Sequence, residues 1–195
     1  MRRRNISSSI AAGSVAWLFS AVLCADTDVD MTATIINNTC KTEISNAFVN
    51  LGTQKLDYFS DTVTANDDYP GGVTFAIRVV ECASDGNAKS QLKMDFHPSS
   101  GQLPADNQQV FANDIVNQSY GAKNVGVVIF SAQDDAERFN VLDSHGASRA
   151  IFPIDASTLD GSEWRFYSRM QKISSGSAVT PGLIQSKVIV DVSYE

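Results

Sequence analysis

The sequence predicts an all-β sandwich, and three observations lead to this expectation. After residue 24, no stretch keeps its apolar residues at helical spacing. Short apolar runs are instead separated by clusters of Gly, Ser, Asn and Asp, which is typical of antiparallel sandwiches. Charged residues make up only 19% of the 195 residues, which is sparse for a helix-rich surface. The length suits one domain.

Five segments carry the strand pattern, with alternating or continuous apolar residues bounded by turn residues. They are residues 73–80, 92–96, 125–130, 164–170 and 188–194. The third is apolar throughout apart from Gly126, so we expect it to be a central strand. In the last, Val188, Val190, Val192 and Tyr194 fall on one face.

The N-terminus predicts a secretory signal peptide over residues 1–24. Three arginines at positions 2–4 precede an apolar run over residues 10–23, which is shorter than the roughly 20 residues of a membrane span. Cleavage after Cys24 is favoured because cleavage one residue later would place the bulky Leu23 at a position that the peptidase reads. Lipidation of Cys24 is the alternative, although Leu23 stands where a small residue is usual.

The charge of the remaining chain excludes nucleic acid as a partner. Removing residues 1–24 takes away three of 15 basic residues and leaves 12 basic against 22 acidic residues, a net charge of −10. Binding to phosphate requires a basic face.

Neither an enzyme nor a metal protein is predicted, and no cofactor is expected. His97 and His145 are the only histidines, and the consecutive residues Asp143, Ser144 and His145 do not provide triad geometry. The aspartates at positions 26, 28 and 30 begin like a calcium loop. The motif fails because Met31 replaces the required Gly and Asn37 the required Glu.

Two cysteines remain after the signal peptide is removed, Cys40 and Cys82. A single pair in an exported chain predicts a disulfide. Closing a loop of 42 positions would stabilise the fold by about 4 kcal/mol in the chain-entropy model. Two buried free thiols are the alternative.

An alternating segment precedes the cysteines. Its apolar residues are Val29, Met31, Ala33 and Ile35, which alternate with Asp and Thr. It lies outside the cysteine loop, near the predicted mature N-terminus. From the pattern alone, the simplest interpretation is the first strand of the sandwich.

Taken together, these residues resemble the pilin subunits of bacterial chaperone–usher fimbriae, and most of all the minor adaptor subunits of type 1-like pili. The order and spacing of several pieces carry the resemblance over nearly the whole mature chain. The pieces are the alternating arm before Cys40, Thr74-Phe75-Ala76-Ile77 before Cys82, Phe166-Tyr167-Ser168-Arg169-Met170, Val179-Thr180-Pro181-Gly182, and the final strand with its penultimate Tyr194.

The resemblance implies an incomplete immunoglobulin-like sandwich of six strands over residues 37–195, with a disulfide between the first two strands. Residues 25–36 would form a donor-strand extension that fills the groove of a neighbouring pilin subunit. The donor residues would be Thr27, Val29, Met31, Ala33 and Ile35. A periplasmic chaperone would read the groove strand through Val188, Val190, Val192, Tyr194 and Glu195.

We therefore expect a structural subunit that passes through the periplasm and an outer-membrane usher to a surface fimbrium that supports cell adhesion. A minor adaptor is the favoured role. A major shaft subunit and an assembly terminator are alternatives within the family, and a secreted carbohydrate-binding sandwich is the alternative from another class.

Overall fold

The computed structural model describes residues 40–44, 48–82, 91–155 and 159–194, so the predicted signal peptide and donor arm lie outside it. Within these ranges it contains nine strands and one short 3₁₀ helix, η1 (Leu56–Tyr58). The strands are β1 (Cys40–Ile44), β2 (Val73–Cys82), β3 (Gln91–Pro98), β4 (Phe111–Ala112), β5 (Val125–Ser131), β6 (Phe139–Asn140), β7 (Ala150–Pro153), β8 (Glu163–Lys172) and β9 (Val188–Tyr194).

Each of the five strand segments predicted from the sequence lies within one of these strands. Of the nine strands in the described residues, six have five residues or more, and β4, β6 and β7 are the shorter ones. The same part of the chain has no helix that is long and apolar enough to cross a membrane.

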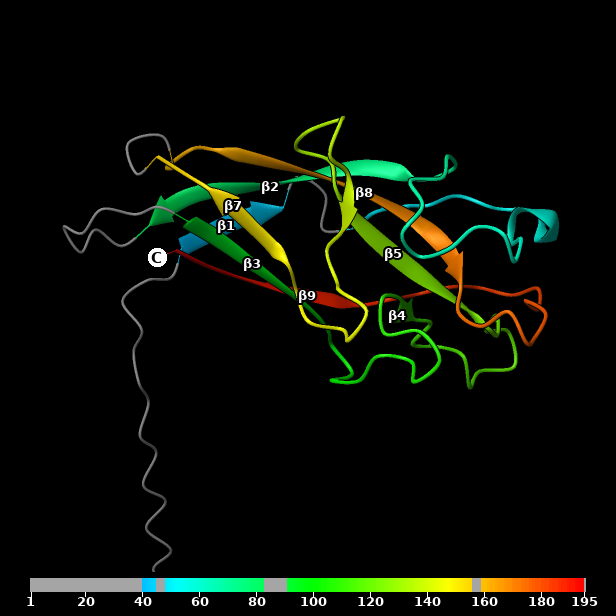
Figure 1. The fold of residues 1–195 in the computed structure, drawn as a ribbon. Helices are drawn as coiled ribbons and strands as arrows, with labels where there is room; N and C mark the ends of the chain where they lie inside the picture. The colour runs from blue at the N-terminus through cyan, green and yellow to red at the C-terminus, as the bar shows by residue number, and fades with distance from the viewer. Residues whose placement is uncertain (1–39, 45–47, 83–90, 156–158, 195) are drawn as a thin grey trace, which may run out of the picture. The chain divides into compact units, whose positions relative to one another are not determined.

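The strands form two antiparallel sheets (Figure 1). One sheet has the order β1-β2-β8-β5-β4, with β6 also paired to β5, and the other has the order β7-β3-β9. In β2 and β3, alternate side chains point into the core, and the buried ones are Phe75, Ile77, Val79, Leu92, Met94 and Phe96. The ring centroid of Phe166 lies 5.7 Å from that of Phe75 and 5.1 Å from that of Phe96, so one aromatic side chain joins the two sheets. The predicted sandwich is confirmed.

Strand β5 is buried on both faces, from Val125 to Ser131. One face contributes to the core between the sheets. On the other face, Val128 and Phe130 pack in a second cluster with Ala65 and Tyr167. Ala65 belongs to the long connection between β1 and β2, so this connection covers the outer face of the larger sheet. Burial on both faces explains why the β5 sequence is continuously apolar rather than alternating.

Arg169 fixes this connection from within β8. Its side chain is fully buried, and its guanidinium donates hydrogen bonds to the backbone oxygens of Thr64 (2.8 Å), Asp67 (2.7 Å) and Met170 (3.1 Å). It also bonds the side chain of Gln171. Burial lowers the pKa of Arg169, since the charged form loses water. Burying a cation without partners is unfavourable in free energy, so these hydrogen-bond acceptors allow the guanidinium to be buried.

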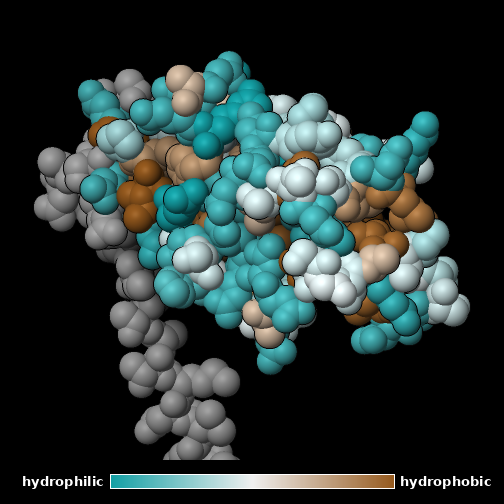
Figure 2. All heavy atoms as spheres, turned by 45° about the vertical axis from the view of Figure 1, so that its right-hand side comes forward, coloured by the Kyte–Doolittle hydropathy of each residue, from teal (hydrophilic) through white to brown (hydrophobic). Residues whose placement is uncertain are grey.

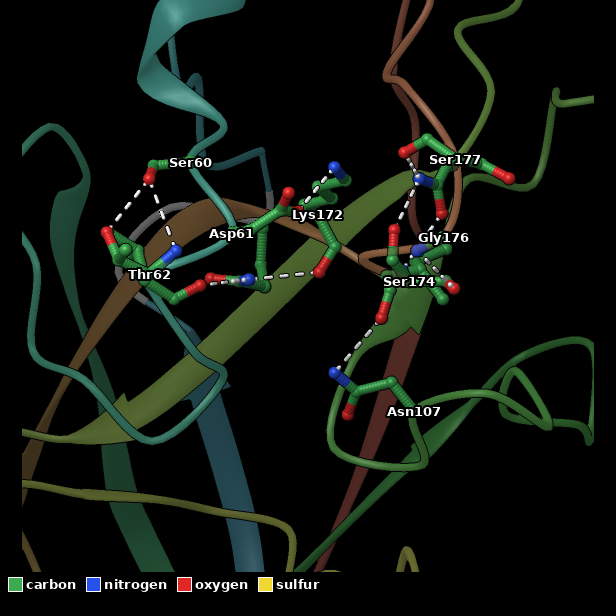
Figure 3. Close-up of polar contacts among 12 residues, drawn as sticks. Ser60, Asp61, Thr62, Asn107, Lys172, Ser174, Gly176 and Ser177 are labelled. Atoms are coloured by element: carbon green, nitrogen blue, oxygen red, sulfur yellow. Dashed lines mark hydrogen bonds and ion pairs between the residues drawn. The ribbon is translucent and has the colours of Figure 1, made fainter.

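Two neighbouring residues of β8 extend the attachment. Gln171 donates to the backbone oxygen of Val63 at 2.9 Å, and Lys172 forms an ion pair of 2.6 Å with Asp61. Figure 3 shows this ion pair beside the hydrogen bond of 2.8 Å between Ser60 and Thr62. Three side chains of β8, those of Arg169, Gln171 and Lys172, therefore hold the connection between residues 61 and 67.

The predicted disulfide is present. Cys40 in β1 and Cys82 in β2 face each other in the strand register and are bonded. The bond ties the short strand β1 to the long strand β2 at the end of the larger sheet. The disulfide excludes the alternative of two buried free thiols.

Replacing both cysteines with alanine is expected to lower the free energy of unfolding by about 4 kcal/mol, because the unfolded chain regains the entropy of an open loop. Urea unfolding of the Cys40→Ala/Cys82→Ala variant and its parent measures this. An unchanged unfolding midpoint would show that the bond does not stabilise the fold.

Replacing Arg169 with methionine is expected to lower the free energy of unfolding by about 3 kcal/mol, because the carbonyls of Thr64 and Asp67 lose their donor. Hydrogen exchange is expected to accelerate in residues 58–70 before other segments. Arg165→Met is the matched control, since Arg165 is exposed on the same strand. Equal losses of stability in both variants would contradict the role assigned to Arg169.

Candidate functional site

Strand β9 is an open edge of the sandwich. It pairs along its whole length with β3, from Leu92 opposite Tyr194 to Pro98 opposite Val188. Among the described residues no strand pairs with its other side (Figure 1). Strand β1 is likewise the edge of the larger sheet. An edge strand presents unpaired N–H and C=O groups, which are a template for pairing with another chain.

A groove of about 600 Å³ opens at this edge and reaches the core. One wall is formed by residues 183–188 and Val190, and the other by Ile44 and residues 48–52. The floor consists of core side chains from both sheets, which are Phe75, Phe96, Val127, Ile129 and Met170, together with Ser168. The sandwich is therefore not closed between its two sheets at this side.

The rim of the groove carries large apolar side chains in contact with solvent. Phe48 is 91% exposed, Leu183 63% and Ile44 44%. Single exposed apolar residues are ordinary, and Figure 2 shows hydrophobic atoms scattered between polar ones on the face that it draws. Three such residues along one apolar groove instead mark a binding surface.

The structure divides the four residues expected to face the groove. Val188 and Val190 are half-buried and line it. Val192 and Tyr194 share their face but are buried in the core between the sheets. Ile189 and Asp191 point to the opposite, exposed face. Glu195 lies outside the described residues, as do the donor residues 27–35.

Side-chain hydrogen bonds to the backbone hold the β9 side of the groove in place. Asn113 is buried, and its Nδ2 donates to the backbone oxygens of Ala122 (2.8 Å) and Leu183 (3.0 Å). Its Oδ1 accepts from the backbone N–H of Gln185 (2.9 Å). The Oδ2 of Asp114 accepts from the backbone N–H of Lys187 at 2.7 Å. The chain before β9 is thus a fixed wall rather than a free loop.

Sequence reasoning missed these anchors and the opposite wall. Asn113 lies in a polar stretch that differs little from any loop. Val49 and Leu51 alternate around Asn50 and pack on the core, so their spacing was a weak signal of a strand-like wall. Phe48 lines the groove beside them.

Asp143 and His97, two residues considered as catalytic candidates, make contacts within the folded chain. The carboxylate of Asp143 accepts hydrogen bonds from the backbone N–H groups of Ala147 (3.0 Å) and His145 (2.8 Å), and these bonds lower its pKa. It therefore caps a turn. His97 lies 2.9 Å from Asp191 on the exposed face of the smaller sheet. The part of the chain described by the structure has no group of three His, Cys, Asp or Glu residues that could hold a metal ion.

Comparisons with known proteins identify the family of the chain. The family model described as "Fimbrial protein" matches residues 29–195. The uncharacterized fimbrial-like protein YadK of Escherichia coli strain K12 is 45% identical over 174 residues, which cover 88% of this chain and 86% of YadK.

Among solved structures, the CupB6 tip adhesin of Pseudomonas aeruginosa overlaps 80% of this chain with a TM-score of 0.52 and 17% identity. At this low identity the likeness concerns the fold alone, and the chain spans only 38% of that adhesin. The P pilus rod subunit PapA overlaps 86% of this chain, and 99% of PapA is covered, with a TM-score of 0.41 and 14% identity.

The family match covers most of the chain, and the relative is similar over almost its whole length. Such subunits are structural components of a surface fimbrium and assemble with other pilin subunits, which accounts for the absence of a catalytic role. The chain belongs to the fimbrial protein family and is a non-enzymatic, immunoglobulin-like structural pilus subunit.

Proposed function

We propose that donor-strand exchange joins this chain to its neighbours, with the groove as acceptor and residues 25–36 as donor arm. The observation that carries the proposal is the groove, where the floor of the core opens to solvent between two strand edges. An extended arm from one neighbour pairs with β9 and covers this floor. The arm of this chain does the same in another subunit.

The dimensions of arm and groove support this pairing. Donor residues 27–35 span about 30 Å when extended, and the seven residues of β9 span about 24 Å as a strand. The alternation of Val29, Met31, Ala33 and Ile35 places all four side chains on one face of the arm. That face meets the floor, while Asp28 and Asp30 face solvent.

The energetics favour a complete insertion. Burying the apolar side chains of the arm contributes on the order of 5–10 kcal/mol. Ordering its backbone costs about 1–2 kcal/mol per residue, so the side chains alone do not hold it. Hydrogen bonds to the open edge of β9 and burial of the groove floor supply the rest. A strand that only formed hydrogen bonds with β9, or only covered the groove floor, would bind weakly.

A subunit with this groove empty is prone to aggregate, because it exposes an unpaired edge beside apolar side chains. A periplasmic chaperone therefore shields the groove until the subunit reaches the outer-membrane usher. The chaperone pairs with β9, contacts Val188 and Val190, and binds the carboxylate of Glu195 with basic groups. Residues 1–24 direct the chain to the periplasm and are removed there.

Within the fimbria, a minor adaptor is the role we assign. An accessible groove together with a donor arm supports an internal position, since a terminator lacks a usable groove. The number of copies per filament separates an adaptor from a shaft subunit. Few copies support the adaptor, and many copies support the shaft.

The Val29→Asp/Met31→Asp variant is expected to lose incorporation into fimbriae by at least about tenfold, since two buried apolar contacts become buried charges. Its periplasmic level is expected to stay normal, because chaperone binding uses the groove. Immunoblots of sheared fimbriae and periplasmic extracts measure both.

The matched control is Thr32→Asp/Thr34→Asp, which adds the same charge to the other face of the arm. We expect this control to be incorporated normally. Normal incorporation of the Val29/Met31 variant would exclude the donor role of the arm.

Val190→Asp is expected to reduce the periplasmic level and the copurifying chaperone several-fold, because it places a charge in the groove wall. Ile189→Asp alters the adjacent, exposed residue of the same strand and is expected to behave like the parent. Quantitative immunoblots after affinity purification compare the two. Equal behaviour of both variants would show that the groove face of β9 is not the chaperone contact.

A further inference from the structure

A second cavity, unrelated to the groove, lies on the connection between β1 and β2. It measures about 480 Å³ and is lined by Thr53, Gln54, Lys55, Asp57, Tyr58 and Tyr69. We call it the tyrosine cup. We propose that the tyrosine cup binds a carbohydrate, as a lateral site on the assembled subunit.

The two aromatic rings form the apolar part of the cup. Their centroids lie 5.5 Å apart with an interplanar angle of 62°. Tyr69 is 39% exposed, although an aromatic ring gains most from burial. A sugar ring carries C–H groups on its faces and hydroxyls on its edge. It therefore packs a face against such a ring while its hydroxyls reach polar groups around it.

Polar side chains with unused hydrogen-bonding capacity surround these rings. Within the residues described by the structure, the side chains of Thr53, Lys55 and Asp57 make no hydrogen bond or ion pair. They offer a hydroxyl, an ammonium donor and a carboxylate acceptor. Their charges cancel, which favours a neutral saccharide over an ionic ligand. A few convergent polar groups beside apolar surface are the usual composition of a small-molecule site.

The back of the cup is rigid. The hydroxyl of Tyr58 donates to the backbone oxygen of Pro70 at 3.0 Å, and Nε2 of Gln54 donates to that of Gly71 at 2.8 Å. Gly71 has a φ of +104°, and a Cβ at this position would lie 2.8 Å from the Tyr58 ring. Only glycine therefore permits this close packing. The buried bonds of Arg169 to Thr64 and Asp67 fix the same connection from below. Preorganisation of this kind reduces the entropic cost of binding a ligand.

The cup is separate from the groove. The groove wall ends at Gly52, and the cup begins at Thr53, so the two cavities share no lining residue. A donor strand or chaperone in the groove does not occupy the cup. The inference therefore goes beyond the proposed function and does not depend on donor-strand exchange.

The test uses the full chain, purified from the periplasm together with the chaperone that binds its groove. It is applied to a printed array of mannose-, galactose-, fucose- and N-acetylglucosamine-terminated glycans. We expect one class to bind, and calorimetry with that glycan to give a Kd that rises about tenfold or more in Tyr69→Ala. Asp57→Ala removes an exposed carboxylate without internal contacts, so it keeps the fold and is expected to weaken binding as well.

Tyr120→Ala is the matched control, because Tyr120 is 55% exposed but does not line the cup. It is expected to bind like the parent. Absence of binding to every glycan on the array would overturn the inference. Binding that both Tyr69→Ala and Asp57→Ala retain in full would overturn it equally, since the contact would then lie elsewhere.

Discussion

At the edge formed by β9, both the backbone hydrogen bonding of the sheet and the burial of the core are incomplete. The outer edge of β9 has no partner strand in the described residues, and the apolar floor beside it, with Phe75 and Phe96, opens into a groove. Each defect alone would be tolerable, as a solvated edge or a small cavity. Together they make the groove a site for a β-strand with one apolar face. Such a strand pairs with the free backbone groups of β9 and covers the apolar floor at the same time.

Contacts elsewhere in the fold fix the elements around the groove. The disulfide fastens β1 to β2, and Asn113 holds the chain that leads into β9. On the far side of the larger sheet, Arg169 binds the long connection that also forms the tyrosine cup. An acceptor that is rigid before binding spends less free energy on ordering, so more of the contact energy holds the incoming strand.

The sequence predicted the sandwich and the five strand segments, because periodicity is a local signal, and it predicted the disulfide because only two cysteines remain after the signal peptide. It placed Val188, Val190, Val192 and Tyr194 on one face of the last strand. It did not predict that the first two line the groove while the last two are buried in the core. That division depends on where β9 leaves the groove and enters the core, which is a property of the packed sheets. The roles of Arg169 and Asn113 could not be predicted either, since they depend on the backbone oxygens of Thr64 and Leu183, which are far away in the chain.

The central claim is that the chain is incomplete as a monomer, and hydrogen exchange of the isolated, mature, full-length monomer tests it most directly. The account predicts rapid exchange for residues 27–35 and for the β9 amides that point away from β3, while β5 and β8 exchange slowly. Slow exchange of residues 27–35 together with both edges of β9 would show that the arm is packed in its own domain, and would contradict the account.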